Sequence, residues 1–319
     1  MATDFLLTLL VAAPVAWAMD LWLGEPNPRW HPVVWMGHYL QRAGAWLQRR
    51  VRTDGTADAA SFWRGAGAWC VGAVAVLLVA GSLQWALLQL HWTWAGVILG
   101  VVLKPLFAYR MLTGEVQGVE AALQQSLPAG QQQLARIVSR DTTVLDEVQV
   151  RESAIESLAE NLNDSVVAAW FWFAIFGLPG AALWRYADTA DSMWGYRGVY
   201  RGKCWEWAGK WAARADDVLA WIPARLTALA FWLSSQPRHF SLRTLRQQAR
   251  VTPSPNSGWP MAAMALALQV VLRKPEVYTL NPHGEVVQSQ HVAQALWLAQ
   301  RAVWWVMGAL ALLVVWRWL

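Results

Sequence analysis

Four carboxylates recur at four-residue intervals in the segment RESAIESLAENLNDS, which runs straight into an apolar stretch. They are Glu152, Glu156, Glu160 and Asp164. Each four-residue step advances about 40° around an α-helix, so this spacing places all four on one face, with Asn161 and Asn163 beside them. Only Arg151 lies close by in the sequence to offset their repulsion. The pattern indicates either a solvated acidic face or a site for Mg²⁺ or a cationic substrate group, because Mg²⁺ takes oxygen ligands.

A second polar group lies in the segment RYADTADSMWGYRGVYRGK. Asp188 and Asp191 are one helical turn apart, and Tyr196, Arg197, Arg201 and Lys203 follow them. Carboxylates beside arginines suit a ligand that carries Mg²⁺ and phosphate, and a surface turn is the alternative. The segment is not a Walker A loop, because Cys204 follows Lys203 where a Ser or Thr should ligate the metal.

Three further acids could either cap a helix or take part in catalysis or binding. In SRDTTVLD, Asp141 could cap a helix or act in catalysis, and Arg140 could hold a phosphate or pair with Asp141. In RADDVLAWIPARL, capping and the helix dipole explain Asp216 and Asp217 at the start of an apolar helix. Arg225 is deeper in that helix, and we expect acidic partners for a cation at membrane depth.

A histidine stands in an irregular segment near the N-terminus, GEPNPRWHPVVWMG, which follows Asp20. His31 precedes a proline, so its backbone is extended and its ring is free to point at a site. A structural role is the alternative for a lone histidine.

The chain as a whole is apolar: 56% of its 319 residues are hydrophobic, 15% are charged, and 25 are tryptophan. This composition predicts an all-α fold, a polytopic integral membrane helical bundle with re-entrant or interfacial helices and cytoplasmic helical loops. Four apolar runs have about the 20 residues of helix that cross a bilayer. They are residues 5–23, 68–90, 92–109 and 302–319, within a single membrane-embedded domain, residues 1–319.

Three other apolar segments are shorter or interrupted: residues 166–186, 218–233 and 261–272. The sequence does not decide whether residues 218–233 span the membrane. Gly177 and Gly180 flank a Leu-Pro pair in the first, which predicts a helical hairpin that enters the membrane and returns. Pro223 and Arg225 interrupt the second, and the third follows the turn-rich segment 253–260. We interpret all three as re-entrant or membrane-associated helices.

Arginines indicate which side of the membrane the loops occupy. Arg29, Arg42, Arg49, Arg50, Arg52 and Arg64 all lie between the first two predicted spans, and no Lys or Arg precedes the first. The positive-inside rule then puts the N-terminus outside and residues 24–66 in the cytoplasm. The first run lacks a basic leader segment and is expected to stay as an anchor. The charge of +5 is dispersed, so no nucleic-acid partner is expected, and two cysteines offer neither a disulfide framework nor a zinc site.

The chain resembles the adenosylcobinamide-phosphate synthase family of cobalamin biosynthesis. The motifs that carry the resemblance, in the family's order, are DLWLGEPNPRWHPVVWMG, SRDTTVL, ESLAENLNDSVVA, YADTADSMWGYR, DDVLAWIPARLTAL and SPNSGWPMAAMA. Members of the family are membrane-bound. They join the propionate carboxylate of adenosylcobyric acid to the amine of an aminoalcohol, free or O-phosphorylated, in an ATP-dependent amide synthesis.

The resemblance implies an acid–amine ligase of the bacterial inner membrane whose active site faces the cytoplasm, with ATP as co-substrate and Mg²⁺ as cofactor. Its partners would be adenosylcobyric acid, aminopropanol or its phosphate, and the bilayer, with homo-oligomers an open possibility. We expect catalytic roles for His31, Asp141, Glu156, Glu160 and Asp191, with His31 or a carboxylate as general base. The expected metal ligands are Glu156, Glu160, Asp164, Asp188, Asp191 and Asp217. The expected substrate- and phosphate-binding residues are Arg140, Asn161, Tyr196, Arg197, Arg201, Lys203, Arg225, Ser254 and Asn256.

Two other functions fit an apolar helical chain. One is a divergent, non-catalytic membrane paralogue that acts as a regulator, because Met261 stands where the family usually has an acid. The other is a small-molecule transporter, although transport sites usually place ionisable residues within broken helices near the bilayer midplane. Most acids here lie in segments expected to be cytoplasmic, which favours the enzyme.

Overall fold

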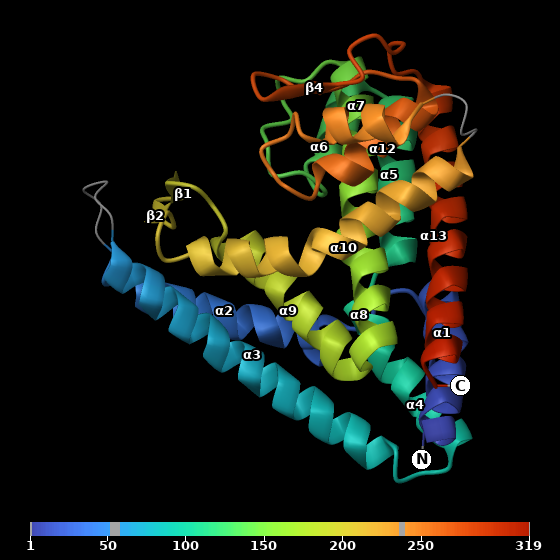
Figure 1. Cartoon of the computed structure of the whole chain (residues 1–319). Helices are drawn as coiled ribbons and strands as arrows, with labels where there is room; N and C mark the ends of the chain where they lie inside the picture. The colour runs from blue at the N-terminus through green and yellow to red at the C-terminus, as the bar shows by residue number, and fades with distance from the viewer. Residues whose placement is uncertain (1, 52–57, 236–239, 319) are drawn as a thin grey trace. The chain divides into compact units, whose positions relative to one another are not determined.

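The computed structural model describes residues 2–51, 58–235 and 240–318 (Figure 1). Within these ranges the chain forms helices α1 to α13 and two short antiparallel hairpins, which confirms the all-α class. Contacts divide the chain into two compact units. Unit 1 holds residues 1–107, 169–219 and 313–319, and unit 2 holds residues 108–168 and 220–312. The single-domain description stays a prediction.

Unit 1 contains the N-terminal helices and the segment around Asp188. Its elements are α1 (Ala2–Leu23), the 3-10 turn η1 (Pro28–Trp30), α2 (Pro32–Gln48), α3 (Ala59–Leu87), α4 (Trp92–Leu103), the 3-10 turn η2 (Lys104–Leu106), most of α8 (Ala168–Phe176), α9 (Leu178–Trp194), β1 (Val199–Tyr200), β2 (Lys203–Cys204) and the start of α10 (Lys210–Ser234). Helix α1 packs along α4, and α9 packs against α2 and α3. Gly100 permits the first contact, because a Cβ there would lie 2.7 Å from the carbonyl oxygen of Ala12.

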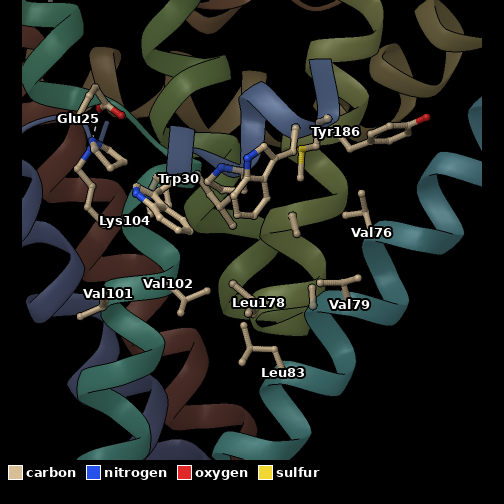
Figure 2. Close-up of a pocket in the computed structure, with 18 of the residues that line it drawn as sticks. Glu25, Trp30, Val76, Val79, Leu83, Val101, Val102, Lys104, Leu178 and Tyr186 are labelled. Carbon is tan, nitrogen blue, oxygen red and sulfur yellow. Dashed lines mark hydrogen bonds and ion pairs between the residues drawn. The ribbon is translucent and has the colours of Figure 1, made fainter. Parts of the chain in front are cut away.

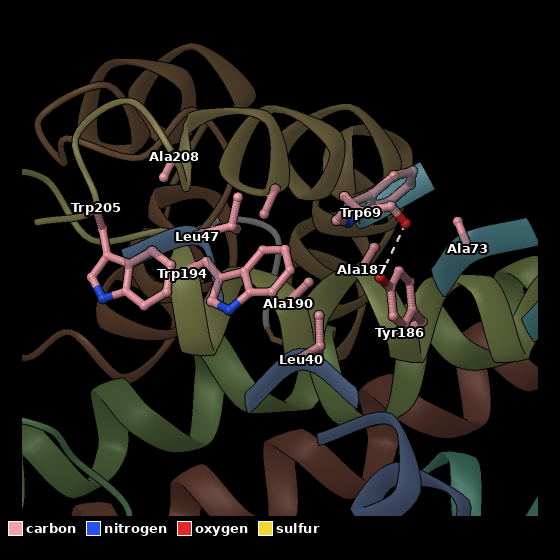
Figure 3. Close-up of a cluster of buried hydrophobic side chains, with 11 residues drawn as sticks. Leu40, Leu47, Trp69, Ala73, Tyr186, Ala187, Ala190, Trp194, Trp205 and Ala208 are labelled. Atoms are coloured by element: carbon pink, nitrogen blue, oxygen red, sulfur yellow. Dashed lines mark hydrogen bonds between the residues drawn. The ribbon is translucent and has the colours of Figure 1, made fainter. Parts of the chain in front are cut away.

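A hydrophobic core holds α2, α3 and α9 of unit 1 together (Figure 3). Trp194 of α9 stacks on Trp205 with ring centroids 6.0 Å apart. Tyr186 is buried in the same core and donates a hydrogen bond of 3.0 Å from its hydroxyl to the carbonyl oxygen of Trp69. Because the polar atom of this tyrosine has a partner, its ring can be buried without an unsatisfied hydroxyl.

Unit 2 is built around α7. Its elements are α5 (Tyr109–Leu123), α6 (Leu127–Leu134), α7 (Glu147–Leu162), the π-helical turn η3 (Asn163–Val167), the rest of α10, α11 (Leu242–Ala249), α12 (Gly258–Leu268), β3 (Leu272–Lys274), β4 (Tyr278–Leu280) and most of α13 (Ser289–Trp318). Helix α7 contacts α5, α6, α12 and β3. Strands β3 and β4 pair with Arg273 opposite Thr279 and Lys274 opposite Tyr278. The hairpin therefore carries two cations and a tyrosine beside α7.

In the part of the chain that the structure describes, four stretches of helix are long and apolar enough to cross a membrane: Thr3–Leu23, Ala59–Leu87, Trp92–Leu123 and Ser289–Trp316. They confirm the prediction of a membrane protein, and each includes most of one predicted span. Arg52 and Leu319, which the sequence analysis used, lie outside the described residues. The membrane association of the three shorter segments stays a prediction.

The Gly177 break separates α8 from α9. Gly177 has a φ of +69°, which favours glycine, and Pro179 lies in the first turn of α9. The backbone N–H of Leu178 donates to Oε1 of Gln84 in α3 at 2.7 Å. The predicted break in the helix is confirmed, and a side chain of α3 caps the new helix.

Candidate functional site

A small polar pocket of about 130 Å³ lies beside α7 in unit 2. Its polar lining residues are Ser139, Arg140, Ser153, Glu156, Ser157, Glu160, Asn161 and Lys274. Helix α7 supplies two carboxylates, the segment before it supplies one cation, and β3 supplies the other. The pocket therefore combines acids and bases in a small volume.

The start of α7 is fixed by a capping box. The carboxylate of Asp146 accepts a hydrogen bond of 2.8 Å from the backbone N–H of Gln149, whose side chain accepts one of 2.9 Å from the backbone N–H of Asp146. Asp141 is exposed and bonds instead to the backbone N–H and hydroxyl of Thr143. The capping role considered for Asp141 is therefore wrong, because its carboxylate closes a local turn that precedes the helix. Those two hydrogen bonds lower the pKa of Asp141.

Glu156 has the most specific surroundings in the pocket. Its Oε1 accepts a hydrogen bond of 2.9 Å from Nη2 of Arg140 and another from the hydroxyl of Tyr278. Its Oε2 is buried and has no hydrogen-bond partner among the described residues. A buried carboxylate oxygen without a partner is costly, so a ligand at this oxygen would stabilise the site.

Glu152 is committed to a structural ion pair. Its side chain is fully buried and accepts hydrogen bonds of 3.1 Å from Nε and 2.6 Å from Nη2 of Arg273. Burial raises the pKa of Glu152, and Arg273 opposes this shift. The four carboxylates spaced along this segment therefore do not form a solvated acidic face at the Glu152 end, because Glu152 and Glu156 are both buried. Arg151 pairs with Glu120 at 2.7 Å. The negative charges of Glu152 and Glu156 are offset instead by Arg273 and Arg140.

Asp164 lies in the π-helical turn η3 rather than in α7. A π turn takes more residues than an α turn, so it interrupts the four-residue spacing on which the predicted face depends. Asp164 accepts a hydrogen bond of 2.7 Å from the amide of Asn163, whose oxygen accepts one of 3.0 Å from Thr227. Asp164 is not among the residues that line the pocket.

The second group of acids belongs to unit 1 and lies on helices. Asp188 and Asp191 are on α9, not in a loop, and Asp216 and Asp217 lie two turns inside α10, so neither of the latter caps it. Burial, with the charges of Asp188 and Asp217, raises the pKa of Asp191 to about 6. Burial also raises the pKa of Asp188, although Arg185 pairs with it at 2.9 Å. Burial raises the pKa of Asp217, against the effect of Arg197.

The predicted phosphate-binding residues after α9 lie around the hairpin of β1 and β2. The rings of Tyr196 and Tyr200 stack with centroids 3.6 Å apart, and the guanidinium of Arg201 lies 5.2 Å from the Tyr200 centroid. Burial and Tyr200 raise the pKa of Tyr196 to about 12. Lys203 is exposed on β2. These residues, like Asp188 and Asp191, belong to unit 1, whereas the polar pocket belongs to unit 2.

Arg225 bonds to neutral groups, which corrects the expectation of acidic partners. Its Nη1 donates to Oδ1 of Asn256 at 2.5 Å, and its guanidinium carbon lies 4.7 Å from the ring centroid of Trp221 and 4.8 Å from that of Trp259. The hydroxyl of Ser254 accepts hydrogen bonds from the backbone N–H groups of Asn256 and Ser257. The aromatic rings replace carboxylates as the partners of this cation.

His31 belongs to a chain of ionisable groups in unit 1. Its Nε2 lies 3.1 Å from Oε2 of Glu25, and Oε1 of Glu25 lies 2.7 Å from Nζ of Lys104. Lys104 also pairs with Asp20 at 2.9 Å. Burial would raise the pKa of Glu25, but the hydrogen bonds from His31 and Lys104 outweigh it and lower that pKa.

The residues of the polar pocket suit an Mg²⁺ ion that binds together with a phosphate, rather than one enclosed by protein ligands alone. No group of three or more His, Cys, Asp or Glu side chains among the described residues is arranged to hold a metal. Mg²⁺ usually binds through one or two carboxylates plus substrate phosphates, and it keeps several waters. Glu156 and Glu160 line the pocket together, and Oε2 of Glu156 has no other partner in the described part of the chain. The donor set therefore suits a metal brought with a phosphate.

Three residues of this site do not stand out in the sequence. Lys274 lines the pocket, Tyr278 donates to Glu156, and Arg273 holds Glu152. The hydroxyl of Tyr278 also lies 3.7 Å from the sulfur of Met261. Met261 is the residue that stands where the resembled family usually has an acid. The basic pair before Pro275 was the only available signal, because the hairpin that brings these residues to α7 has no helical periodicity.

A family model described as CobD/Cbib protein matches residues 13–303. The chain is 38% identical over 288 residues to the cobalamin biosynthesis protein CobD of Stutzerimonas stutzeri, covering 87% of this chain and 89% of that relative. It is 34% identical over 288 residues to a probable cobalamin biosynthesis protein CobD of Methanothermobacter thermautotrophicus, covering 88% and 90% of the two chains. A similar protein of Thermococcus kodakarensis is 36% identical over 309 residues, covering 96% and 95%. No solved structure matches the chain.

Proposed function

This chain belongs to the CobD/Cbib protein family, and we propose that its part in cobalamin biosynthesis is an ATP-dependent amide ligation. The proposed acid is adenosylcobyric acid, and the proposed amine is aminopropanol or its phosphate. The reaction is proposed to occur at the cytoplasmic side of a bacterial inner membrane. The observation that supports it best is the polar pocket beside α7, where Glu156, Arg140 and Lys274 meet.

Amide formation at neutral pH requires an activated carboxylate, most simply an acyl phosphate. A carboxylate oxygen of the acid attacks the γ-phosphorus of ATP and ADP leaves; the amine then attacks the acyl carbon, loses a proton and displaces phosphate. Phosphoryl transfer depends mainly on positioning and on positive charge around the phosphate oxygens. A metal ion held by Glu156 and Glu160 would supply part of that charge. Arg140 and Lys274 would bind phosphate oxygens from the other walls of the pocket.

His31 of unit 1 keeps its role as a candidate general base, which is a prediction separate from the polar pocket of unit 2. If Nε2–H donates to Glu25, the lone pair of Nδ1 is left to accept a proton. Nδ1 is buried and has no hydrogen-bond partner among the residues that the structure describes. Glu25 would thus fix the tautomer and leave Nδ1 able to accept a proton.

The test is product formation by purified, detergent-solubilised protein. The protein is given adenosylcobyric acid, ATP, Mg²⁺ and aminopropanol phosphate, and the corrinoid product is followed by mass. We expect Glu160→Gln to lower the rate by at least about tenfold, since removing even an outer partner of a metal ligand has an effect of that size. The matched control is Glu147→Gln on the same helix, whose side chain is 58% exposed and is not part of the pocket lining.

Loss of product in the Glu160→Gln variant but not in Glu147→Gln supports the ligase and its site. No product from the wild type, beside an active family member assayed in parallel, would overturn the proposed activity. Equal rates in the wild type and both variants would keep the activity but exclude the pocket as its site.

A further inference from the structure

A second, much larger cavity of about 720 Å³ lies in unit 1 (Figure 2). Its side walls come from α3, α4 and α9, and the segment around η1 and α2 covers one end. The polar pocket proposed for the ligase chemistry belongs to unit 2 and shares no lining residue with this cavity, although Glu25, the partner of His31, lies at one end of it. The identity of a ligand in this cavity is therefore independent of the proposed ligation.

The walls of the cavity are aliphatic and aromatic, and the cavity is open where exposed residues of α3 and α4 line it. Two small residues of α3, Ala75 and Ala80, line the face toward the cavity, whereas the space beside Gly72 is filled by Tyr186 and Tyr39. At its rim, Val79 is 70% exposed and Val101 is 45% exposed. Both belong to helices that are long and apolar enough to span a membrane, so this side of the cavity is built from residues suited to the hydrocarbon of the bilayer.

The polar groups of the cavity gather at one end. Figure 2 shows Glu25, Lys104 and Trp30 toward the end covered by α2, and Leu178 and Leu83 farther from that end. Trp30 is 75% exposed, and exposed tryptophans are typical of the level of lipid headgroups. The cavity therefore has a polar end at the membrane interface and an apolar end inside the membrane.

The depth of the cavity matches one leaflet. Along α3 its lining extends from Gly72 to Leu83, which at 1.5 Å per residue is about 16 Å. The hydrocarbon core of a bilayer is about 30 Å thick, so each leaflet contributes about half of that. An acyl chain of one leaflet would thus reach from the polar end of the cavity to its apolar end.

We propose that this cavity is a binding site for an acyl chain of a membrane phospholipid, with the headgroup beside Trp30. A corrinoid is a poor occupant, because its peripheral amides would lose their hydrogen bonds to water against walls that offer few polar partners. The bound chain fills the space between α3 and α4, and it stays with the protein during extraction in detergent.

The test compares the wild type with a variant in which a bulky ring fills the cavity. Ala75→Trp places the ring inside, and Val74→Trp is the matched control: the adjacent residue of the same helix is 55% exposed and does not line the cavity. Each protein is extracted from membranes, washed extensively in detergent and analysed by native mass spectrometry. Circular dichroism and gel filtration establish that each is folded, and Val102→Trp, from α4, replaces Ala75→Trp if that variant misfolds.

We expect a retained phospholipid on the wild type and on Val74→Trp, and its loss from Ala75→Trp. Retention by all three proteins would overturn the assignment to this cavity. Adducts of detergent only, or of a non-lipid metabolite, would overturn the proposed ligand. A lipid-free dimer of the wild type that dissociates in Ala75→Trp would identify a second copy of the chain as the occupant instead.

Discussion

At the scale of single residues, the two oxygens of Glu156 have different surroundings. Oε1 accepts hydrogen bonds from Arg140 and Tyr278, whereas Oε2 has no partner among the described residues. The bonds to Oε1 fix the carboxylate and leave Oε2 for a ligand. Arg140 is itself oriented by Ser153, to which it donates at 3.3 Å. The arrangement is that of a positioned ligand group rather than of a simple ion pair.

Tyr278→Phe tests this positioning role. The substitution keeps the ring but removes the hydroxyl that donates to Oε1 of Glu156. A hydrogen bond to a charged group contributes about 1.5–3 kcal/mol, so we expect the ligase rate to fall by about tenfold or more. Arg140 still pairs with Glu156, so the protein should stay folded.

The measurement is kcat/KM at several Mg²⁺ concentrations, with binding of Mn²⁺ followed by its magnetic resonance signal as a readout independent of activity. Glu147→Gln, at an exposed position of α7 outside the pocket lining, serves as the control. An unchanged Mg²⁺ dependence and unchanged Mn²⁺ binding in Tyr278→Phe would show that Glu156 does not depend on this hydroxyl.

At the scale of elements, α7 shows where sequence patterns predict well and where they do not. The four-residue spacing correctly placed Glu152, Glu156 and Glu160 on a helix, because a local period is enough to do so. It did not reveal that Glu152 is paired with Arg273, since that pair joins residues 121 positions apart. The π turn at Asn163 likewise depends on packing that no local pattern records.

The capping box gives a prediction about the stability of α7. Asp146→Ala removes the side chain that caps the helix, which typically costs about 1 kcal/mol. In a chain of this length we expect the thermal midpoint to fall by about 2 °C. Asp141→Ala removes only an exposed turn contact before the helix and should have a smaller effect.

Thermal unfolding of the two variants in detergent, followed by circular dichroism at 222 nm, provides the comparison. If Asp141→Ala lowered the midpoint more than Asp146→Ala, the turn at Asp141 rather than the capping box would limit the stability of this region.

At the scale of the whole molecule, the composition and the apolar runs were sufficient to predict a helical membrane protein. Within the hydrocarbon core no water is available, so the backbone N–H and C=O groups of a spanning segment must bond to each other, as they do in a helix. Long apolar runs therefore identify helices directly. The division into two units was not predictable, because it joins segments far apart in the sequence. As a result, residues grouped by their chemistry, such as Glu160 and Asp191, belong to different units.

The direction of the spans gives the last prediction. With the N-terminus outside, the short connection between α3 and α4 is also outside, and the hairpin of β1 and β2 is cytoplasmic only if residues 166–186 return to the side they entered from. We use a background in which Cys70 and Cys204 are replaced by serine, and single cysteines at Gln89 or Val199, both exposed positions. A membrane-impermeant maleimide should label Gln89→Cys in intact spheroplasts, but label Val199→Cys only after permeabilisation.

Labelling of both positions in intact spheroplasts would mean that residues 166–186 cross the membrane completely, because the cations of the β1–β2 hairpin would then be outside. Labelling of Val199→Cys alone would invert the whole chain and place the arginines between the first two spans on the outer side. Labelling after permeabilisation controls for the reactivity of each cysteine. The predicted pattern therefore requires a return of the chain at Gly177, where the helix breaks and α9 begins.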